Sequence, residues 1–237
     1  FAIFTERAFE QIRNGVARPN LPVHICGSHG GTHTGTDGSS AQSIEDLAIY
    51  RTLPNMTVMH PCDDVSAAEL TRQCLDLTGP SYMRTARNKT MVLHENRIDD
   101  VKIGKGIVLR DGSDVCIIAC GVLVAKALEA AEKLAGDGIE ASVVDMHTLK
   151  PLDGDLINRM VASTGCVVSA EDHSIIGGLG GAIAEHLSSN HPVPLERVGV
   201  KDRFGESGQA EEMLDLLGLN TGDIIEAAHK AISRKSN

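Results

Sequence analysis

The residues best suited to chemistry lie in a glycine-rich loop that runs from Gly27 to Gly38. The loop follows a short apolar segment, residues 21–26, and contains His29, His33 and Asp37 among several hydroxyl side chains. Glycine lets a backbone approach a ligand closely, and an imidazole can donate or accept a hydrogen bond near neutral pH. The loop therefore predicts a site for a polar ligand, in preference to a simple surface turn.

The spacing of His29 and His33, four positions apart, would place two metal ligands on one face of a helix. No helix is expected here, and the loop offers no clear third ligand. We therefore predict no metal ligand in this chain.

Two arginines lie near the end of the apolar segment 81–85. Arg84 is inside the segment, and Arg87 follows it. The planar guanidinium group suits phosphate, and a chain with 22 basic and 32 acidic residues must meet an anion with such a local cluster. The pattern fits an anion clamp and surface ion pairs with carboxylates equally well.

Composition excludes several classes of protein. Of the 237 residues, 42% are apolar and 23% charged, which is typical of a globular protein. Only 3% are aromatic and the net charge is −10, so we expect no nucleic-acid partner. No apolar run is long enough to span a bilayer and no signal-peptide pattern is present, so we expect a cytoplasmic protein without membrane contact. The six cysteines form no Cys-x-x-Cys pair, which predicts reduced thiols, most of them in the core.

The first third of the chain alternates helical and strand patterns. Helices are expected over 3–17 and 44–53 and after a capping box formed by Ser66 and Glu69. Strands are expected over 21–26, 56–60 and 81–85. Residues 88–113 are less periodic and are interpreted as a linker.

The alternation resumes after this linker. It predicts strands over 114–120, 141–146, 166–170 and 195–200, and helices over 123–135, 153–163, 180–188, 208–217 and 222–234. Apolar strands separated by helices indicate mainly parallel sheets flanked by helices. We expect an α/β protein of two domains, 1–95 and 101–237. Because the chain opens on Phe1 within an apolar pattern, we also expect an upstream part of the first domain to be missing.

Several motifs make the chain resemble the transketolase family. The stretches 35–48 and 51–58 resemble its pyrimidine-binding domain, and the stretches 148–153 and 171–180 resemble its C-terminal domain. The motifs occur in the family's order over nearly the whole chain. The resemblance implies the C-terminal subunit of a split transketolase, or the same part of a full-length one.

The resemblance assigns roles to five residues. Phe1 and Phe4 match the aromatics that pack on the pyrimidine ring of thiamine diphosphate, and their spacing of three would place both rings on one helix face. His29 and Arg87 match the pair that binds the substrate phosphate. Asp37 matches the acid that bonds a substrate hydroxyl near the reacting carbon, so Asp37 and His29 are the implied catalytic residues.

Three positions depart from the family pattern. Thr36 stands where the family usually has Glu, Ala41 where it has His or Gln, and His33 where a small residue is expected. Ala41 cannot donate a hydrogen bond, so the identity of the sugar stays open.

The implied reaction moves a two-carbon ketol unit from a ketose phosphate to an aldose phosphate through a thiamine diphosphate carbanion. The family's catalytic Glu and its Gly-Asp-Gly…Asn site for magnesium and diphosphate are not in these 237 residues. The resemblance therefore implies a partner chain or domain that binds most of the cofactor and the magnesium, in a dimer or heterotetramer. Alternatives are deoxyxylulose phosphate synthase, a 2-oxo acid dehydrogenase beta-type subunit, and a non-catalytic assembly or regulatory subunit.

Overall fold

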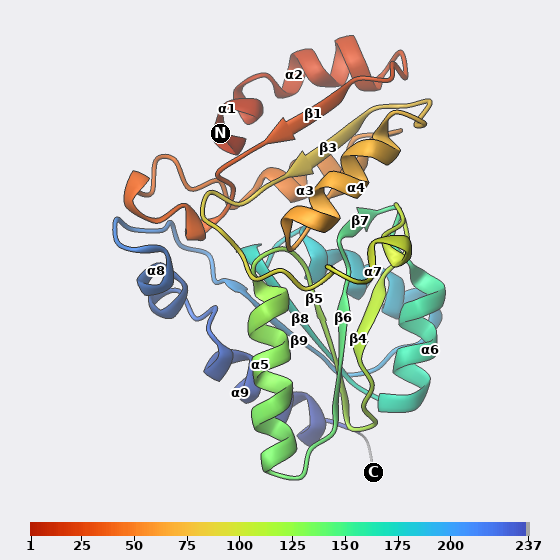
Figure 1. The fold of residues 1–237 in the computed structure, drawn as a ribbon, viewed down its shortest axis with the longest axis vertical. Helices are drawn as coiled ribbons and strands as arrows, with labels where there is room; N and C mark the ends of the chain where they lie inside the picture. The colour runs from red at the N-terminus through yellow and green to blue at the C-terminus, as the bar shows by residue number, and fades with distance from the viewer. Residues whose placement is uncertain (236–237) are drawn as a thin grey trace.

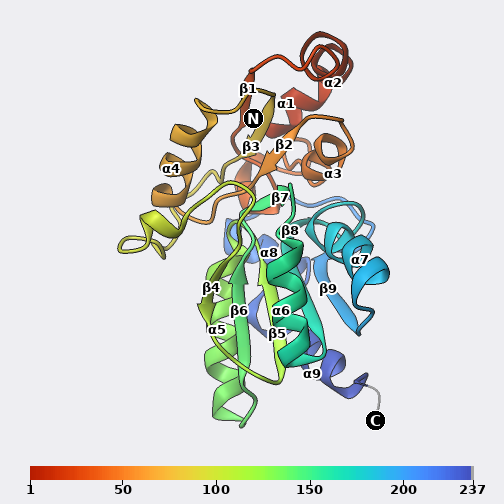
Figure 2. The same ribbon diagram turned by 90° about the vertical axis from the view of Figure 1, so that its right-hand side faces the viewer.

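Two β-sheets, each covered by helices, form the frame of the protein (Figure 1). The computed structural model describes residues 1–235. The first sheet has the order β1-β3-β2-β7 and the second the order β4-β6-β5-β8-β9. The two sheets are stacked end to end along the long axis of the molecule (Figure 2). The predicted fold class, α/β with mainly parallel sheets flanked by helices, is confirmed.

The first sheet is built mainly from the N-terminal third. Strands β1 (His24–Gly27) and β2 (Thr57–Met59) flank β3 (Ser81–Arg84), and all three are parallel. The fourth strand, β7 (Thr148–Lys150), comes from the second half of the chain and pairs antiparallel with β2. The sequence did not predict this strand, because its three residues follow directly on another strand.

The helices of this first unit lie in the predicted regions, but the helix expected over 3–17 is divided at Ala8 and one cap differs. They are α1 (Ala2–Arg7), α2 (Phe9–Ile12), a π-helical turn (Arg13–Ala17), α3 (Asp46–Arg51) and α4 (Asp64–Cys74). The predicted Ser66–Glu69 capping box is wrong. Helix α4 starts one turn earlier, because the Asp63 carboxylate accepts the Ser66 backbone N–H and so caps the first turn.

The second sheet contains an edge strand that the sequence missed. Strands β5 (Val115–Ala119), β6 (Ala141–Asp145), β8 (Val167–Ser174) and β9 (Leu195–Val200) are parallel. Strand β4 (Ile107–Arg110) pairs antiparallel with β6. The predicted linker 88–113 therefore contains a strand, as well as a 3-10 turn (Ile98–Asp100).

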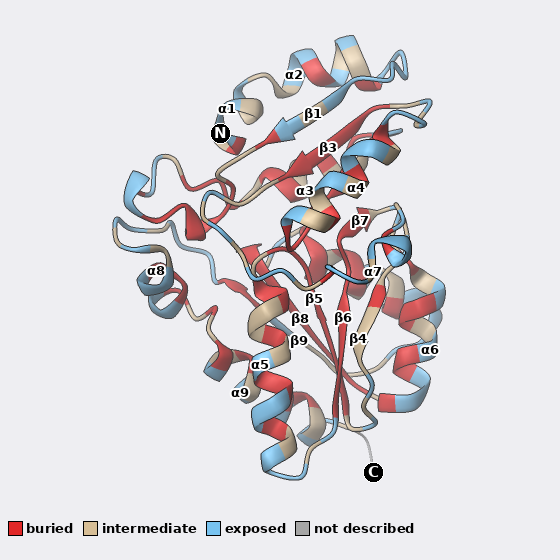
Figure 3. Ribbon diagram, in the orientation of Figure 1, coloured by how far each residue is buried: buried red, intermediate tan, exposed pale blue. Residues whose placement is uncertain are grey.

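Helices cover both faces of the second sheet. They are α5 (Leu123–Gly136), α6 (Gly154–Thr164), α7 (Leu179–Asn190), α8 (Ala210–Leu216) and α9 (Thr221–Ser233). Along β5, Val115 and Ile117 face one core cluster while Cys116 and Ile118 face the other. This period of two explains why the strand is apolar throughout, and why the central strands are buried on both faces in Figure 3.

All six cysteines are free thiols, as predicted, and five of them are buried. Cys26 is the exception, since it lies exposed on the edge strand β1. Among residues 1–235, no helix combines the length and the apolar character that crossing a membrane requires.

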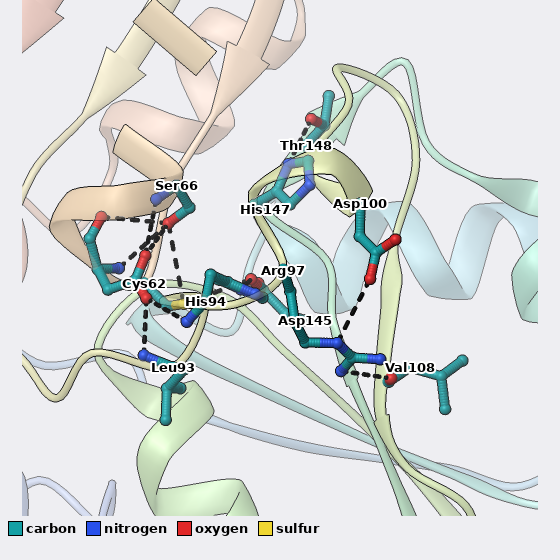
Figure 4. Close-up of polar contacts among 11 residues, drawn as sticks. Cys62, Ser66, Leu93, His94, Arg97, Asp100, Val108, Asp145, His147 and Thr148 are labelled. Carbon is teal, nitrogen blue, oxygen red and sulfur yellow. Dashed lines mark hydrogen bonds and ion pairs between the residues drawn. The ribbon is translucent and has the colours of Figure 1, made fainter. Parts of the chain in front are cut away.

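A buried polar cluster connects the two sheets (Figure 4). His94, from the segment between them, places Nε2 2.8 Å from Asp145 Oδ2 at the end of β6. The Cys62 thiol lies 3.4 Å from the same oxygen. Asp63 accepts the backbone N–H groups of Leu93 and His94 at 2.7 and 2.8 Å. Cys62, Asp63 and His94 are close enough to one another for metal ligation, but the Cys62 thiol, the Asp63 carboxylate and His94 Nε2 each have a hydrogen-bond partner within the protein.

This cluster favours the charged form of His94. Burial alone lowers the pKa of an imidazole, but the hydrogen bond and charge of Asp145, together with the charge of Asp63, raise the pKa of His94 above its usual value. A histidine shifted in this direction stabilises the fold fully below its unfolded pKa, and the contribution is lost as the pH rises through the folded value.

Replacing His94 by Gln should therefore destabilise the protein in a pH-dependent way. The loss of unfolding free energy relative to wild type should be large at about pH 6 and smaller at about pH 9. Chemical denaturation at both pH values measures this difference, with His191→Gln at an exposed position as the control. An equal loss at both pH values would show that His94 is not charged in the folded protein.

Candidate active site

The predicted ligand loop lies at the carboxyl ends of β1 and β3, beside α8 (Figure 1). These two strands are parallel and hydrogen-bonded to each other, so the segments that follow them emerge at the same edge of the sheet. One segment contains a 3-10 turn (Thr32–Asp37) and the other contains Arg87. This edge is where α/β proteins place ligands.

The two predicted cofactor-packing aromatics lie next to the predicted anion-binding histidine. The ring centroids of Phe1 and Phe4 are 5.4 Å apart, and the Phe1 and His29 centroids are 4.2 Å apart. Phe1 is 40% exposed and Phe4 is 69% exposed, so both rings are accessible. These residues form an open aromatic surface that continues into the loop.

Asp37 and Arg87 also meet at this edge. Asp37 Oδ2 lies 3.0 Å from Arg87 Nε, and each side chain is about one-third exposed, at 30% and 34%. A guanidinium group has five N–H donors, so an ion pair through Nε leaves others for an anion. The structure thus brings a carboxylate and a cation together from the two segments predicted to form the site.

The charges of these neighbours act on His29. Burial lowers the pKa of His29, Asp37 opposes this shift, and Arg87 reinforces it, so the net pKa is lowered. The shift favours the neutral form of His29. Its Nδ1 lies 3.0 Å from the Ser28 hydroxyl, and its backbone has φ 59°, an unusual value for a residue other than glycine.

Arg84, the other cation of the sequence pattern, does not belong to an exposed anion clamp. Its side chain is fully buried, with Nε 3.4 Å from Asp46 Oδ2 and Nη2 donating to the Ser43 carbonyl at 2.9 Å. Asp46 also accepts the Tyr82 hydroxyl at 2.7 Å. The alternative of pairing with a carboxylate is correct for Arg84, although the pair lies in the interior rather than at the surface.

His33 does not join His29 as a ligand. His33 is buried, with Nε2 4.0 Å from a carboxylate oxygen of Glu211 on α8. Of the two other unusual positions, Thr36 is exposed and Ala41 is partly buried in the same loop.

Sequence reasoning missed two acids of β8 that lie behind the site. Asp172 accepts hydrogen bonds from Thr32 and His33, at the start of the 3-10 turn. Glu171 accepts the backbone N–H groups of Leu179 and Gly180, at the start of α7. Both acids lie in a motif that the sequence analysis used only for the family resemblance. Charged residues inside a buried strand were the signal that could have identified them.

The fold and this edge define an α/β protein whose candidate site lies where parallel strands end. The chain belongs to the transketolase family, because two family models match it over most of its length. Residues 1–92 match the family model of the transketolase pyrimidine-binding domain, and residues 104–224 match that of the transketolase C-terminal domain.

Relatives of known name include subunits of split transketolases. The 6-deoxy-6-sulfo-D-fructose transketolase subunit SqwH of Clostridium sp. strain MSTE9 is 42% identical, over 99% of this chain and 73% of that protein. A solved split-gene transketolase, described as an inactive beta4 tetramer, is 44% identical with a TM-score of 0.93, over 100% of this chain and 76% of that one. A 1-deoxy-D-xylulose-5-phosphate synthase of Geobacter sulfurreducens is 34% identical, over 99% of this chain and 37% of that protein.

Replacing Asp46 by Ala should strongly destabilise the first unit, because it leaves the buried charge of Arg84 without this partner. Removing one member of a buried ion pair costs about 3–5 kcal/mol. The free energy of unfolding from chemical denaturation measures the loss, and Asp76→Ala in an exposed turn is the control. A loss as small as that of the control would show that Asp46 does not compensate Arg84.

Proposed function

We propose that this chain is the substrate-orienting part of a ketol transferase, active only with a partner that binds the cofactor diphosphate. His29 and Arg87 bind the terminal anion of the sugar, and Asp37 accepts a hydrogen bond from a sugar hydroxyl. The observation that carries the proposal is the convergence of His29, Asp37 and Arg87, from two separate segments, at one edge of the sheet. A donor, an acceptor and a cation suit a polyhydroxylated anion.

The aromatic surface fits the pyrimidine of thiamine diphosphate. Phe1 and Phe4 present adjacent, exposed rings, and a heteroaromatic ring packs favourably on such a surface. When bound, this cofactor supplies the covalent chemistry of ketol transfer. The partner would hold the diphosphate and the magnesium.

The side chains of this chain then act by orientation. The Ser28 hydroxyl can donate to His29 Nδ1, which leaves the proton on Nε2 to donate to an oxyanion. Stacking of His29 on Phe1 links the anion site to the cofactor surface, so the two ligands are placed relative to each other. Such positioning lowers the activation free energy, because the entropy lost in bringing the reactants together is lost on binding and not in the chemical step.

The need for a partner is supported by the solved relative whose description names an inactive tetramer of beta chains. The anion on the sugar is either a phosphate or a sulfonate, because the name of one relative specifies a sulfonated sugar. Phosphate and sulfonate share three equivalent oxygens, which the same donors can bind. We propose phosphate as the anion, and an assay with phosphorylated and sulfonated sugars compares the two.

The first test is reconstitution with a diphosphate-binding chain and a ketol-transfer assay with and without thiamine diphosphate. Activity should require both chains and the cofactor. In that assembly, His29→Ala and Arg87→Ala should each raise KM for the anionic ketose about tenfold or more, since a hydrogen bond to a charged group contributes about 1.5–3 kcal/mol. Sugars that carry phosphate, sulfonate or neither identify the anion, and the neutral sugar should show no such rise.

Arg110→Ala is the matched control, because Arg110 forms a surface ion pair with Glu140 away from the site. Unchanged kinetics in both site variants of an active complex would favour the alternative of a non-catalytic assembly or regulatory subunit. Activity on pyruvate and an aldose, without ketol transfer, would favour a deoxyxylulose phosphate synthase. Oxidative decarboxylation of a 2-oxo acid would indicate the dehydrogenase alternative.

A further inference from the structure

We propose that Asp172, on β8 of the second sheet, is a positioning residue that fixes the loop presenting His29 and Asp37. The inference rests on the proposed function for the role of that loop. It gives the second half of the chain a part in substrate binding, although Asp172 itself touches no substrate.

The contacts of Asp172 are directed at the loop. Asp172 is 1% exposed, and its Oδ1 accepts the Thr32 backbone N–H at 2.8 Å and the Thr32 hydroxyl at 2.7 Å. Its Oδ2 accepts the His33 backbone N–H at 2.9 Å. The preceding residue, Gly31, has φ 79°, and a Cβ atom there would collide with the carboxylate. The backbone at Gly31 therefore lies so close to the Asp172 carboxylate that only glycine fits at this position.

These contacts hold the segment between the two site residues. Thr32 and His33 begin the 3-10 turn that ends at Asp37, so the carboxylate fixes the start of the turn that presents Asp37. The next residue, Thr34, donates its hydroxyl to the His29 carbonyl at 2.7 Å. That bond connects the anchored turn to His29, whose positive φ requires support from its surroundings.

The far end of the loop is also held by the second half of the chain. The Gln42 side-chain amide donates to the Gly35 carbonyl at 3.2 Å and to the Glu206 carbonyl at 2.9 Å. Gly35, with φ 70°, lies against the backbone of Ala210. The 3-10 turn is thus held at its start and at Gly35 by contacts that involve the second half of the chain, and Asp172 is the charged residue among them.

The test uses the reconstituted complex and compares Asp172→Asn with wild type. An amide keeps the size of the side chain but presents N–H groups where one backbone N–H now donates. KM for the anionic ketose should rise about tenfold, the effect of losing one hydrogen bond to a charged group, with kcat within about twofold. Hydrogen exchange at the Thr32 and His33 amides should accelerate, while exchange in β8 stays unchanged.

Two further variants separate positioning from general stability. Asp153→Asn is the matched control, since this buried carboxylate also accepts two backbone N–H groups but takes them from Leu156 of α6 and from Gly106, just before β4. It should leave KM unchanged. Thr32→Val removes one contact to Asp172 and keeps the charge of the buried carboxylate, so it provides the test if Asp172→Asn does not fold, with a smaller rise in KM expected.

An unchanged KM in Asp172→Asn and Thr32→Val, in an active complex, would overturn the positioning role alone. So would a fall in kcat at constant KM, or a rise in KM that Asp153→Asn reproduces. A wild-type complex without any ketol transfer would overturn the proposed function, and the inference with it.

Discussion

The constraint behind this structure is that irregular backbone buried between two sheets must still have its N–H groups satisfied. A buried, unpaired amide costs roughly 1–3 kcal/mol, and the loop after β1 has no strand or long helix to supply partners. Carboxylates fill that need. Asp172 accepts from the loop, Asp63 from the segment before His94, and Glu171 from the start of α7. Carboxylates thus accept backbone N–H groups at three places where the two sheets meet.

This arrangement explains why acids, usually excluded from buried strands, occur side by side in β8. A carboxylate that accepts several N–H groups is tolerated in the interior because those donors replace its hydration. Glu171 and Asp172 are neighbours in the chain but contact different elements. One fixes a helix start in the second unit, and the other fixes the loop of the first.

The repeated elements of the fold could be predicted because they follow from hydrophobic periodicity. Strand β5, for example, is apolar on both faces, and α5 carries a regular buried stripe. Strands β4 and β7 could not be predicted in this way. Both are short strands at the edge of a sheet, and so few residues leave little periodic signal. Phe1, His29, Asp37 and Arg87 could be proposed from motif and residue type, and the structure brings them together at one edge. Their roles still depend on the proposed function. The support by Asp172 could not be found from the sequence, since it joins positions 140 residues apart.

Arg84, at the end of β3, and Arg87, beyond it, show how burial decides between chemically identical groups. Arg84 is the last residue of the strand, so its side chain enters the interior, where it pairs with Asp46 and is closed to ligands. Arg87 lies three residues further on, beyond the sheet, and pairs with Asp37 while about one-third exposed. A surface ion pair contributes only about 0–1 kcal/mol, so an incoming anion can compete for Arg87 at little cost. The same competition at Arg84 would require opening a buried pair, which costs several times more. A spacing of three residues therefore separates a cation that maintains the fold from one that is free to exchange partners.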